Sequence, residues 1–181
     1  IKLDAAYINN AGQGNNVLLA GNNINLDVVT QSRQENIQTT NDQRSESVQW
    51  DTGSNIQTQQ NLTLQAGRDI SAKAANINSD HSVVQLNAGR DVSIVNGQNT
   101  ADVDETHFNK SSGFLFSSSK LVKDTLHSTE SVASNVTVQK VQIKGGNDVN
   151  VIGSSVVSDQ LTQIQAGYDV NIVNAQNTEQ T

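Results

Sequence analysis

The sequence predicts an all-β protein built as a parallel β-helix. A turn centred on glycine recurs along the chain, and the turns at Gly67 and Gly89 lie 22 residues apart. Apolar residues alternate before and after each turn, as in Leu62 to Ala66 and Ile70 to Ala72. A period of two indicates strands. A repeat of about 20 residues is too short for a domain, so each copy must bury its apolar face on the next.

The turns share a glycine that is followed two residues later by an asparagine or aspartate. The glycines are Gly21, Gly67, Gly89, Gly146 and Gly167, and the acidic residues are Asp69, Asp91, Asp148 and Asp169. We expect Gly67, Gly89, Gly146 and Gly167 either to adopt backbone angles that a Cβ disfavours or to lie where neighbouring turns crowd together. We expect the aspartates to cap backbone N–H groups.

The stacked aspartates also raise the possibility of a calcium site, because equivalent residues on paired strands lie about 4.8 Å apart. The capping interpretation is favoured, since Arg68 and Arg90 lie beside the carboxylates in the sequence and offset their repulsion. The Gly-Gly-x-Gly-x-Asp pattern of calcium-binding β-rolls is missing. The histidines His81, His107 and His127 share no metal-ligand spacing and are expected at the surface. We predict no metal, no cofactor and no catalytic residue.

The composition suits a solenoid better than a globular core. Only 3% of the 181 residues are aromatic and 34% are hydrophobic, which is enough for a narrow column of stacked Val, Ile, Leu and Ala. The 23 Asn are expected in turns and in side-chain ladders. Proline is absent, as suits a fold in which neighbouring coils use nearly every backbone N–H.

Charge and cysteine content exclude several classes of partner and chemistry. The net charge of −7, with no basic run to neutralise phosphates, argues against nucleic acid. The chain has no Cys, which excludes disulfides and thiol chemistry. Its apolar runs are too short to span a bilayer. The chain starts at Ile1 with neither Met nor a signal sequence, and we interpret it as a piece of a longer protein.

Two segments interrupt the coils. We place coils at about 1–30, 54–100 and 135–181, all in one β-helix segment, and excursions at about 31–53 and 101–134. The first excursion is highly polar and has Asn41-Asp42 near its middle, which predicts a hairpin, with disorder as the alternative. The second is predicted as a hairpin whose arms are 103–108 and 125–132.

The excursions carry the residues that we expect to contact a partner. The second has a Gly/Ser-framed apolar tip with lysines nearby, and the first contributes a tryptophan; the candidates are Phe108, Phe114, Leu115, Phe116 and Trp50. Exposed aromatics at a loop tip are typical anchors for a protein, a lipid surface or a neighbouring filament. Lys110, Lys120 and Lys123 favour an acidic or lipid surface. The alternative is that these side chains pack over the flank of the helix as a second small core.

A longer repeat contains both the coils and the excursions. The stretch Ile94 to Thr100 recurs as Ile172 to Thr178, and Ser79-Asp80 recurs as Ser158-Asp159, at an offset of 78 or 79 residues. The larger unit is therefore two coils and one excursion.

Three features together resemble a known family. They are the alternation of Ala-Gly-x-Asp coils with Ser/Thr-rich excursions, the Ser-Gly-Phe-Leu-Phe tip, and the return through Ser-Asn-Val-Thr-Val. They are similar to the haemagglutinin-repeat region of filamentous-haemagglutinin-like exoproteins of two-partner secretion, and most like CdiA-type contact-dependent growth inhibition proteins. The resemblance implies a right-handed β-helix of about five to six coils, exported through the periplasm of a Gram-negative bacterium by an outer-membrane transporter.

The resemblance also implies a non-catalytic segment of a secreted or cell-surface adhesin or toxin-delivery filament. Such a segment would contact the target-cell surface or outer membrane, and its own neighbouring coils. The alternative is a polysaccharide-active lyase or hydrolase, because such enzymes also use right-handed β-helices. A lyase needs acids and bases that converge on one groove, whereas here Asp and Arg recur at the same turn of successive coils.

Overall fold

The computed structural model describes residues 1–79 and 82–181, so the prediction for His81 and the Asp80 half of the Ser79-Asp80 repeat lie outside the described residues. The prediction of an all-β protein is confirmed. The described residues contain no helix that is long and apolar enough to cross a membrane. The chain forms two compact units. The parallel unit comprises Ile1–Val29, Asp51–Gly97 and Ser131–Gln176, and the hairpin unit comprises Thr30–Trp50, Gln98–Glu130 and Asn177–Thr181.

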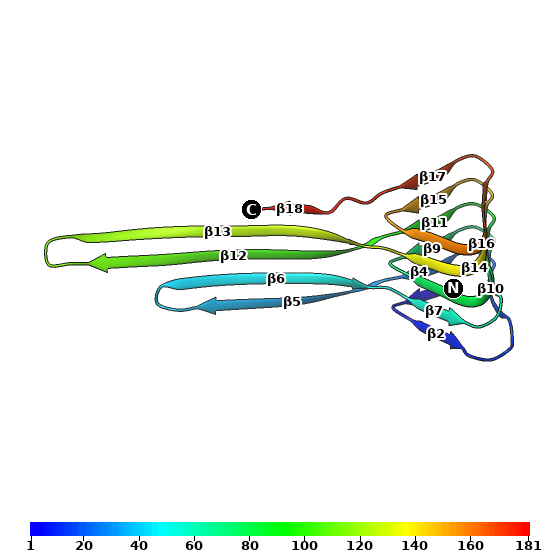
Figure 1. Cartoon of the computed structure of the whole chain (residues 1–181), viewed down its shortest axis with the longest axis horizontal. Coiled ribbons are helices and arrows are strands. Elements are labelled where there is room, and N and C mark those ends of the chain that lie inside the picture. Colours follow the sequence, from blue (N-terminus) through cyan, green and yellow to red (C-terminus); the bar gives the residue numbers. More distant parts are fainter. The chain divides into compact units, whose positions relative to one another are not determined.

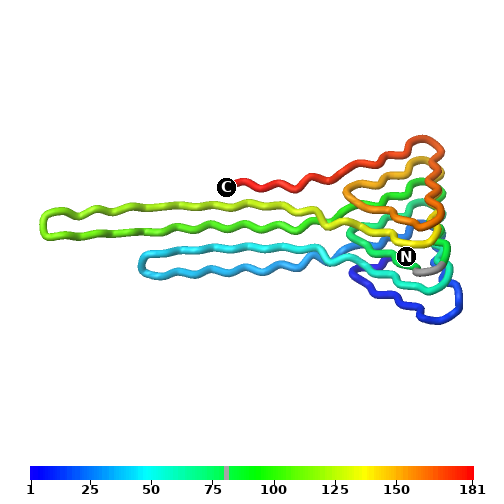
Figure 2. Tube along the Cα trace, viewed as in Figure 1, coloured from blue at the N-terminus to red at the C-terminus, as the bar shows by residue number. Residues whose placement is uncertain are grey.

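The parallel unit contains two sheets whose strands pair in parallel, in the manner of a β-helix (Figure 1). The first sheet has the strand order β1 (Lys2–Asp4), β4 (Ile24–Asp27), β9 (Ile70–Lys73), β11 (Val92–Val95), β15 (Val149–Ile152) and β17 (Val170–Val173). The second contains β2 (Tyr7–Asn10), β3 (Asn16–Ala20), β7 (Asn55–Thr58), β8 (Leu62–Ala66), β10 (Asn76–Ala88), β14 (Asn135–Gly145) and β16 (Ser155–Ala166). The chain passes alternately through the two sheets (Figure 2).

In-register pairing stacks like residues into columns. Ile70 pairs with Ile24 on one side and with Val92 on the other, and Val92 pairs with Val149. All four side chains are at most 1% exposed. Side chains alternate between the two faces of a sheet along each strand. Columns that point into the core therefore alternate with columns that point outward.

The outward faces carry amide ladders, as expected for an Asn-rich chain. Asn135 Nδ2 donates to Asn76 Oδ1 at 3.1 Å, and Asn171 Nδ2 donates to Asn150 Oδ1 at 2.9 Å. These bonds link side chains of neighbouring strands, parallel to the backbone ladder.

Two buried serines lie where the chain enters the strand that follows each hairpin. Ser134 precedes β14, is fully buried, donates to the carbonyl of Val95 at 2.7 Å and accepts from the N–H of Ala75 at 2.9 Å. Ser54 precedes β7 and donates to the carbonyl of Leu3 at 2.9 Å. These serines satisfy backbone groups that the interruption of the strand ladder would otherwise leave unpaired.

The hairpin unit contains one antiparallel sheet. Its strands are β5 (Val29–Gln38), β6 (Asp42–Thr52), β12 (Gly97–Ser112), β13 (Ser117–Val132) and β18 (Thr178–Gln180), in the order β18-β13-β12-β6-β5. The first predicted excursion is a hairpin, and the N–H of Thr39 donates to the carbonyl of Asp42 at 2.8 Å across its turn. The Asn41-Asp42 signal therefore marked the turn correctly.

Candidate functional site

The predicted turn residues of the parallel unit form two ladders. In the glycine ladder, a Cβ placed on Gly89 would lie 2.2 Å from the carbonyl oxygen of Gly67, and one on Gly146 would lie 2.1 Å from that of Gly89. Gly67 faces Gly21, and Gly167 faces Gly146, in the same way. None of the five has a positive φ. Of the two reasons expected for glycine at these turns, crowding applies at Gly67, Gly89, Gly146 and Gly167, and unusual backbone angles apply at none of them; a Cβ on Gly21 would meet no atom within 4 Å.

The aspartate ladder caps backbone groups one level along the stack. The N–H of Asp91 donates to Asp69 Oδ1 at 3.4 Å, that of Asp148 to Asp91 Oδ1 at 3.3 Å, and that of Asp169 to Asp148 Oδ1 at 3.1 Å. Asn23 takes the same place at the start of the ladder, accepting from the N–H of Asp69 at 3.3 Å.

Arg90 offsets the repulsion between two of these carboxylates. Its Nε and Nη2 contact the carboxylate of Asp69 at 2.8 and 2.7 Å, and Nε also lies 3.1 Å from Asp91. The hydrogen bond to Asp69, with the nearby negative charge, raises the pKa of Arg90. These carboxylates are thus engaged in backbone capping and ion pairing. Among the residues that the structure describes, no group of three or more His, Asp or Glu is arranged to hold a metal ion.

In the hairpin unit, β6 and β12 join the two hairpins through nine residue pairs, from Asn99–Trp50 to His107–Asp42. Charged side chains strengthen this contact. Arg44 Nε lies 3.1 Å from Glu105, and His107 Nδ1 lies 2.9 Å from Asp42. The hydrogen bond to Asp42 raises the pKa of His107 above its ordinary value.

The second hairpin ends in an apolar tip. The N–H of Gly113 donates to the carbonyl of Phe116 at 2.7 Å and closes the turn. Phe114, Leu115 and Phe116 are 102%, 78% and 83% exposed, so they form no second core. Leu121 is also exposed. The tip therefore presents three consecutive large apolar side chains to solvent, which soluble proteins rarely do without a partner.

Charge is segregated around this tip. Residues 106–123 contain Lys110, Lys120 and Lys123 and no Asp or Glu, although the whole chain has a net charge of −7. All three lysines are exposed. The distal part of the hairpin is thus a basic, apolar extension of an acidic protein.

The structure separates the other two candidate contact residues from the tip. Phe108 lies beside the turn of the first hairpin, where its N–H donates to the carbonyl of Asn41 at 2.7 Å, and it is partly exposed. Trp50 is half-buried at the opposite end of β6, as the partner of Asn99. The aromatic residues of the excursions therefore do not form one cluster.

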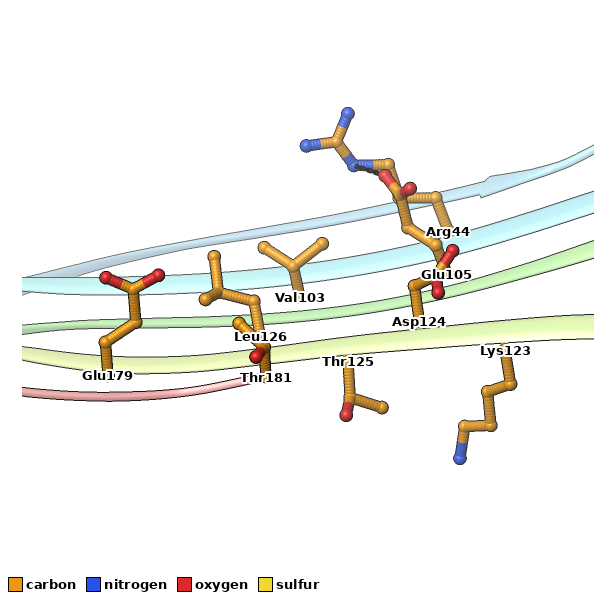
Figure 3. Close-up of a pocket in the computed structure, with 9 residues that line it drawn as sticks. All are labelled: Arg44, Val103, Glu105, Lys123, Asp124, Thr125, Leu126, Glu179 and Thr181. Atoms are coloured by element: carbon orange, nitrogen blue, oxygen red, sulfur yellow. Dashed lines mark ion pairs between the residues drawn. The ribbon is translucent and has the colours of Figure 1, made fainter.

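Sequence reasoning did not find a hollow of about 770 Å³ beside β13. Figure 3 shows its lining: Arg44, Val103, Glu105, Lys123, Asp124, Thr125, Leu126, Glu179 and Thr181. These side chains come from β6, β12, β13, β18 and the residue after β18. Only the pairing of strands from different hairpins brings them together, and no single sequence motif signals that pairing.

Comparison with known families shows to which family the chain belongs. A sequence model of the hemagglutinin repeat matches the chain twice, over residues 39–121 and 115–181. The chain belongs to the hemagglutinin-repeat family. Each match starts at or beside a hairpin turn, and the first match extends past the turn of the second hairpin. The family is typically a structural, non-enzymatic segment of secreted, filamentous cell-surface proteins. Neither curated proteins nor solved structures gave a significant match.

Proposed function

We propose that this chain is a non-catalytic structural and interaction segment of a filamentous-haemagglutinin-like adhesin or toxin-delivery exoprotein. In this proposal the parallel unit is a right-handed β-helix of five to six coils that extends the filament. The in-register columns, the glycine ladder and the aspartate ladder support this proposal, because each feature repeats from one level of the stack to the next. The turn glycines and aspartates therefore serve the stacking of coils.

The finer relationship is to CdiA-type contact-dependent inhibition proteins. The Ser-Gly-Phe-Leu-Phe tip followed by the Ser-Asn-Val-Thr-Val return supports it. The full-length protein would then be exported by an outer-membrane transporter of two-partner secretion. Expressing the parent gene with and without that transporter, and measuring the protein at the cell surface, tests this assignment.

The hairpin tip is the contact site of the segment in this proposal. The observation that carries it is the near-complete exposure of Phe114, Leu115 and Phe116. Burying apolar surface stabilises a complex by about 25 cal/mol per Å², which would favour binding of these side chains to a partner. The lysines around the tip favour an acidic partner surface, such as the target-cell outer membrane.

The test is a triple substitution, Phe114→Ser, Leu115→Ser and Phe116→Ser. We expect loss of binding to target cells and liposomes with an unchanged melting temperature, because these side chains stabilise nothing in the free chain. Ser117→Ala, Ser118→Ala and Ser119→Ala together form the matched control and should bind normally. Deletion of 111–119 should reproduce the triple substitution. Full binding by the variant with three serines at the tip, or by the deletion variant, would refute the assignment of the tip.

The enzyme alternative has its own assay. Incubating the purified chain with polysaccharides, with and without calcium, should give no turnover. Asp69, Asp91 and Asp148 already accept hydrogen bonds from the next level, and Arg90 pairs with two of them. Robust degradation would replace the structural proposal.

A further inference from the structure

The two contacts between successive hairpins have the same form. β6 pairs with β12 in an antiparallel ladder in which Gln49 is the partner of Thr100. β13 pairs with β18, also antiparallel, with Thr129 as the partner of Thr178. In each case the second strand of one hairpin pairs with the next strand that leaves the parallel unit.

The first strands can be aligned through the parallel sheet. Val95, Ile152 and Val173 are successive partners in one column. Thr100 lies five residues after Val95, and Thr178 lies five residues after Val173. The two threonines are therefore at equivalent positions of the repeat, and both follow an asparagine.

The second strands can be aligned in the same way. Asn55 and Asn135 are both partners of Asn76 in the second parallel sheet. Gln49 lies six residues before Asn55, and Thr129 lies six residues before Asn135. The pairs Gln49–Thr100 and Thr129–Thr178 are thus the same pair in consecutive repeats. The register between hairpins is a property of the repeat and does not depend on the individual side chains.

The edge of β13 is only partly used. β18 covers His127 to Thr129, and no strand in the described part of the chain pairs with β13 on that side from Ser117 to Leu126. The corresponding β6–β12 ladder extends over nine pairs. An open edge presents unpaired N–H and C=O groups that can bind another strand.

The hollow beside β13 lies next to this edge. Leu126 and Val103 point into it from neighbouring strands, with the carboxylate of Glu179 beside them (Figure 3). Leu126 is half-buried. A strand added along β13 beyond Thr178 would cover Leu126 and satisfy the backbone groups of the edge.

We propose that the edge of β13 from Ser117 to Leu126 binds the first strand of a further hairpin of the same repeat. The strand is antiparallel and continues the register of the Thr129–Thr178 pair. The hairpin sheet then grows by two strands with each repeat, as one continuous sheet. The occupant is a strand of this repeat because the bound part of the edge, at β18, already holds one. This inference depends on strand register and not on the proposed contact at the tip.

The test extends the chain. Residues 179–181 are replaced by a copy of residues 101–134, which supplies a third hairpin directly after Thr178. Hydrogen exchange of those amides between Ser117 and Leu126 that point away from β12, every second one along the strand, should slow by on the order of tenfold relative to the original chain. Unchanged exchange, with the amides of β10 and β14 still protected, would overturn the proposal. The triple substitution at the tip is made in the original chain, so the two tests fail independently.

Disulfide formation reports the register. The chain has no native Cys, so cysteines can be placed at Leu126 and at the copied Val103, which the register sets opposite each other. This pair should oxidise readily. The control pairs the copied Val103→Cys with Val122→Cys, four residues away on the same face, and should stay reduced. Preferential oxidation of the control pair would overturn the register. Concentration-dependent protection of this edge in the original chain would assign it to a second copy instead and would also overturn the proposal.

Discussion

The hydroxyl of Ser134 donates a 2.7 Å hydrogen bond to the carbonyl oxygen of Val95, the last residue of the strand that precedes the second hairpin. The same hydroxyl accepts from Ala75 at 2.9 Å. One buried side chain therefore joins the strand end before the excursion to the point where the chain returns. A polar residue that the sequence pattern does not mark as special thus allows a hairpin to interrupt the stack.

Ser134→Ala should lower the free energy of unfolding by about 2 kcal/mol, because it leaves the Ala75 N–H and the Val95 carbonyl without this buried partner. Chemical denaturation measures the loss. Ser118→Ala, on the exposed arm of the second hairpin, is the control and should change stability very little. Equal stability of the two variants would contradict the role of Ser134.

Gly89→Ala should destabilise the chain by about 3 kcal/mol, since its Cβ would lie 2.2 Å from the carbonyl oxygen of Gly67 and the backbone must move. Gly21→Ala is the matched control. It has the same turn position, but a Cβ there meets no atom within 4 Å. Thermal melts should separate the two variants, and similar melting temperatures would show that turn crowding is unimportant.

Ile94→Asp should destabilise the parallel unit by at least about 3 kcal/mol, because Ile94 is fully buried and an unpaired charge there loses its hydration. Ser93→Asp places the same charge on the outward face of the same strand and should be tolerated far better. Circular-dichroism melts measure both. A melt of Ile94→Asp that matches that of Ser93→Asp would reject the inward register of β11.

His107 should titrate with a pKa above 6.5, because Asp42 accepts a hydrogen bond from its ring and stabilises the protonated form. The protonated ring stabilises the β6–β12 contact fully below the unfolded-state pKa, and this contribution is lost as the pH rises through the higher folded-state pKa. NMR titration of the ring measures the shift.

Asp42→Asn should bring the pKa of His107 back towards 6.5. Asp104→Asn is the control. Asp104 lies three residues before His107, so its side chain points to the other face of β12, and its removal should leave the titration of His107 nearly unchanged. Titration of His107 at its ordinary pKa in the unmodified chain would contradict the cross-strand contact.

Local pattern determined much of this protein. Alternation around Gly67 and Gly89 was enough to predict strands and their inward faces, because a period of two has a fixed relation to the pleat. The Asn41-Asp42 turn and the polar or apolar character of each excursion were also readable, since turn chemistry acts over a few residues. The tip residues Phe114 to Phe116 stood out because the rest of the chain has so few aromatics.

Tertiary structure decided what depends on pairing between distant segments. The sequence left two explanations for the turn glycines, and only the stacking of Gly89 on Gly67 selected crowding. Trp50 and Phe114 looked alike as candidates, yet strand register places Trp50 beside Asn99 and leaves Phe114 at a turn. The open edge of β13 could not be predicted, because the register between two hairpins arises from backbone hydrogen bonds that carry no sequence signature.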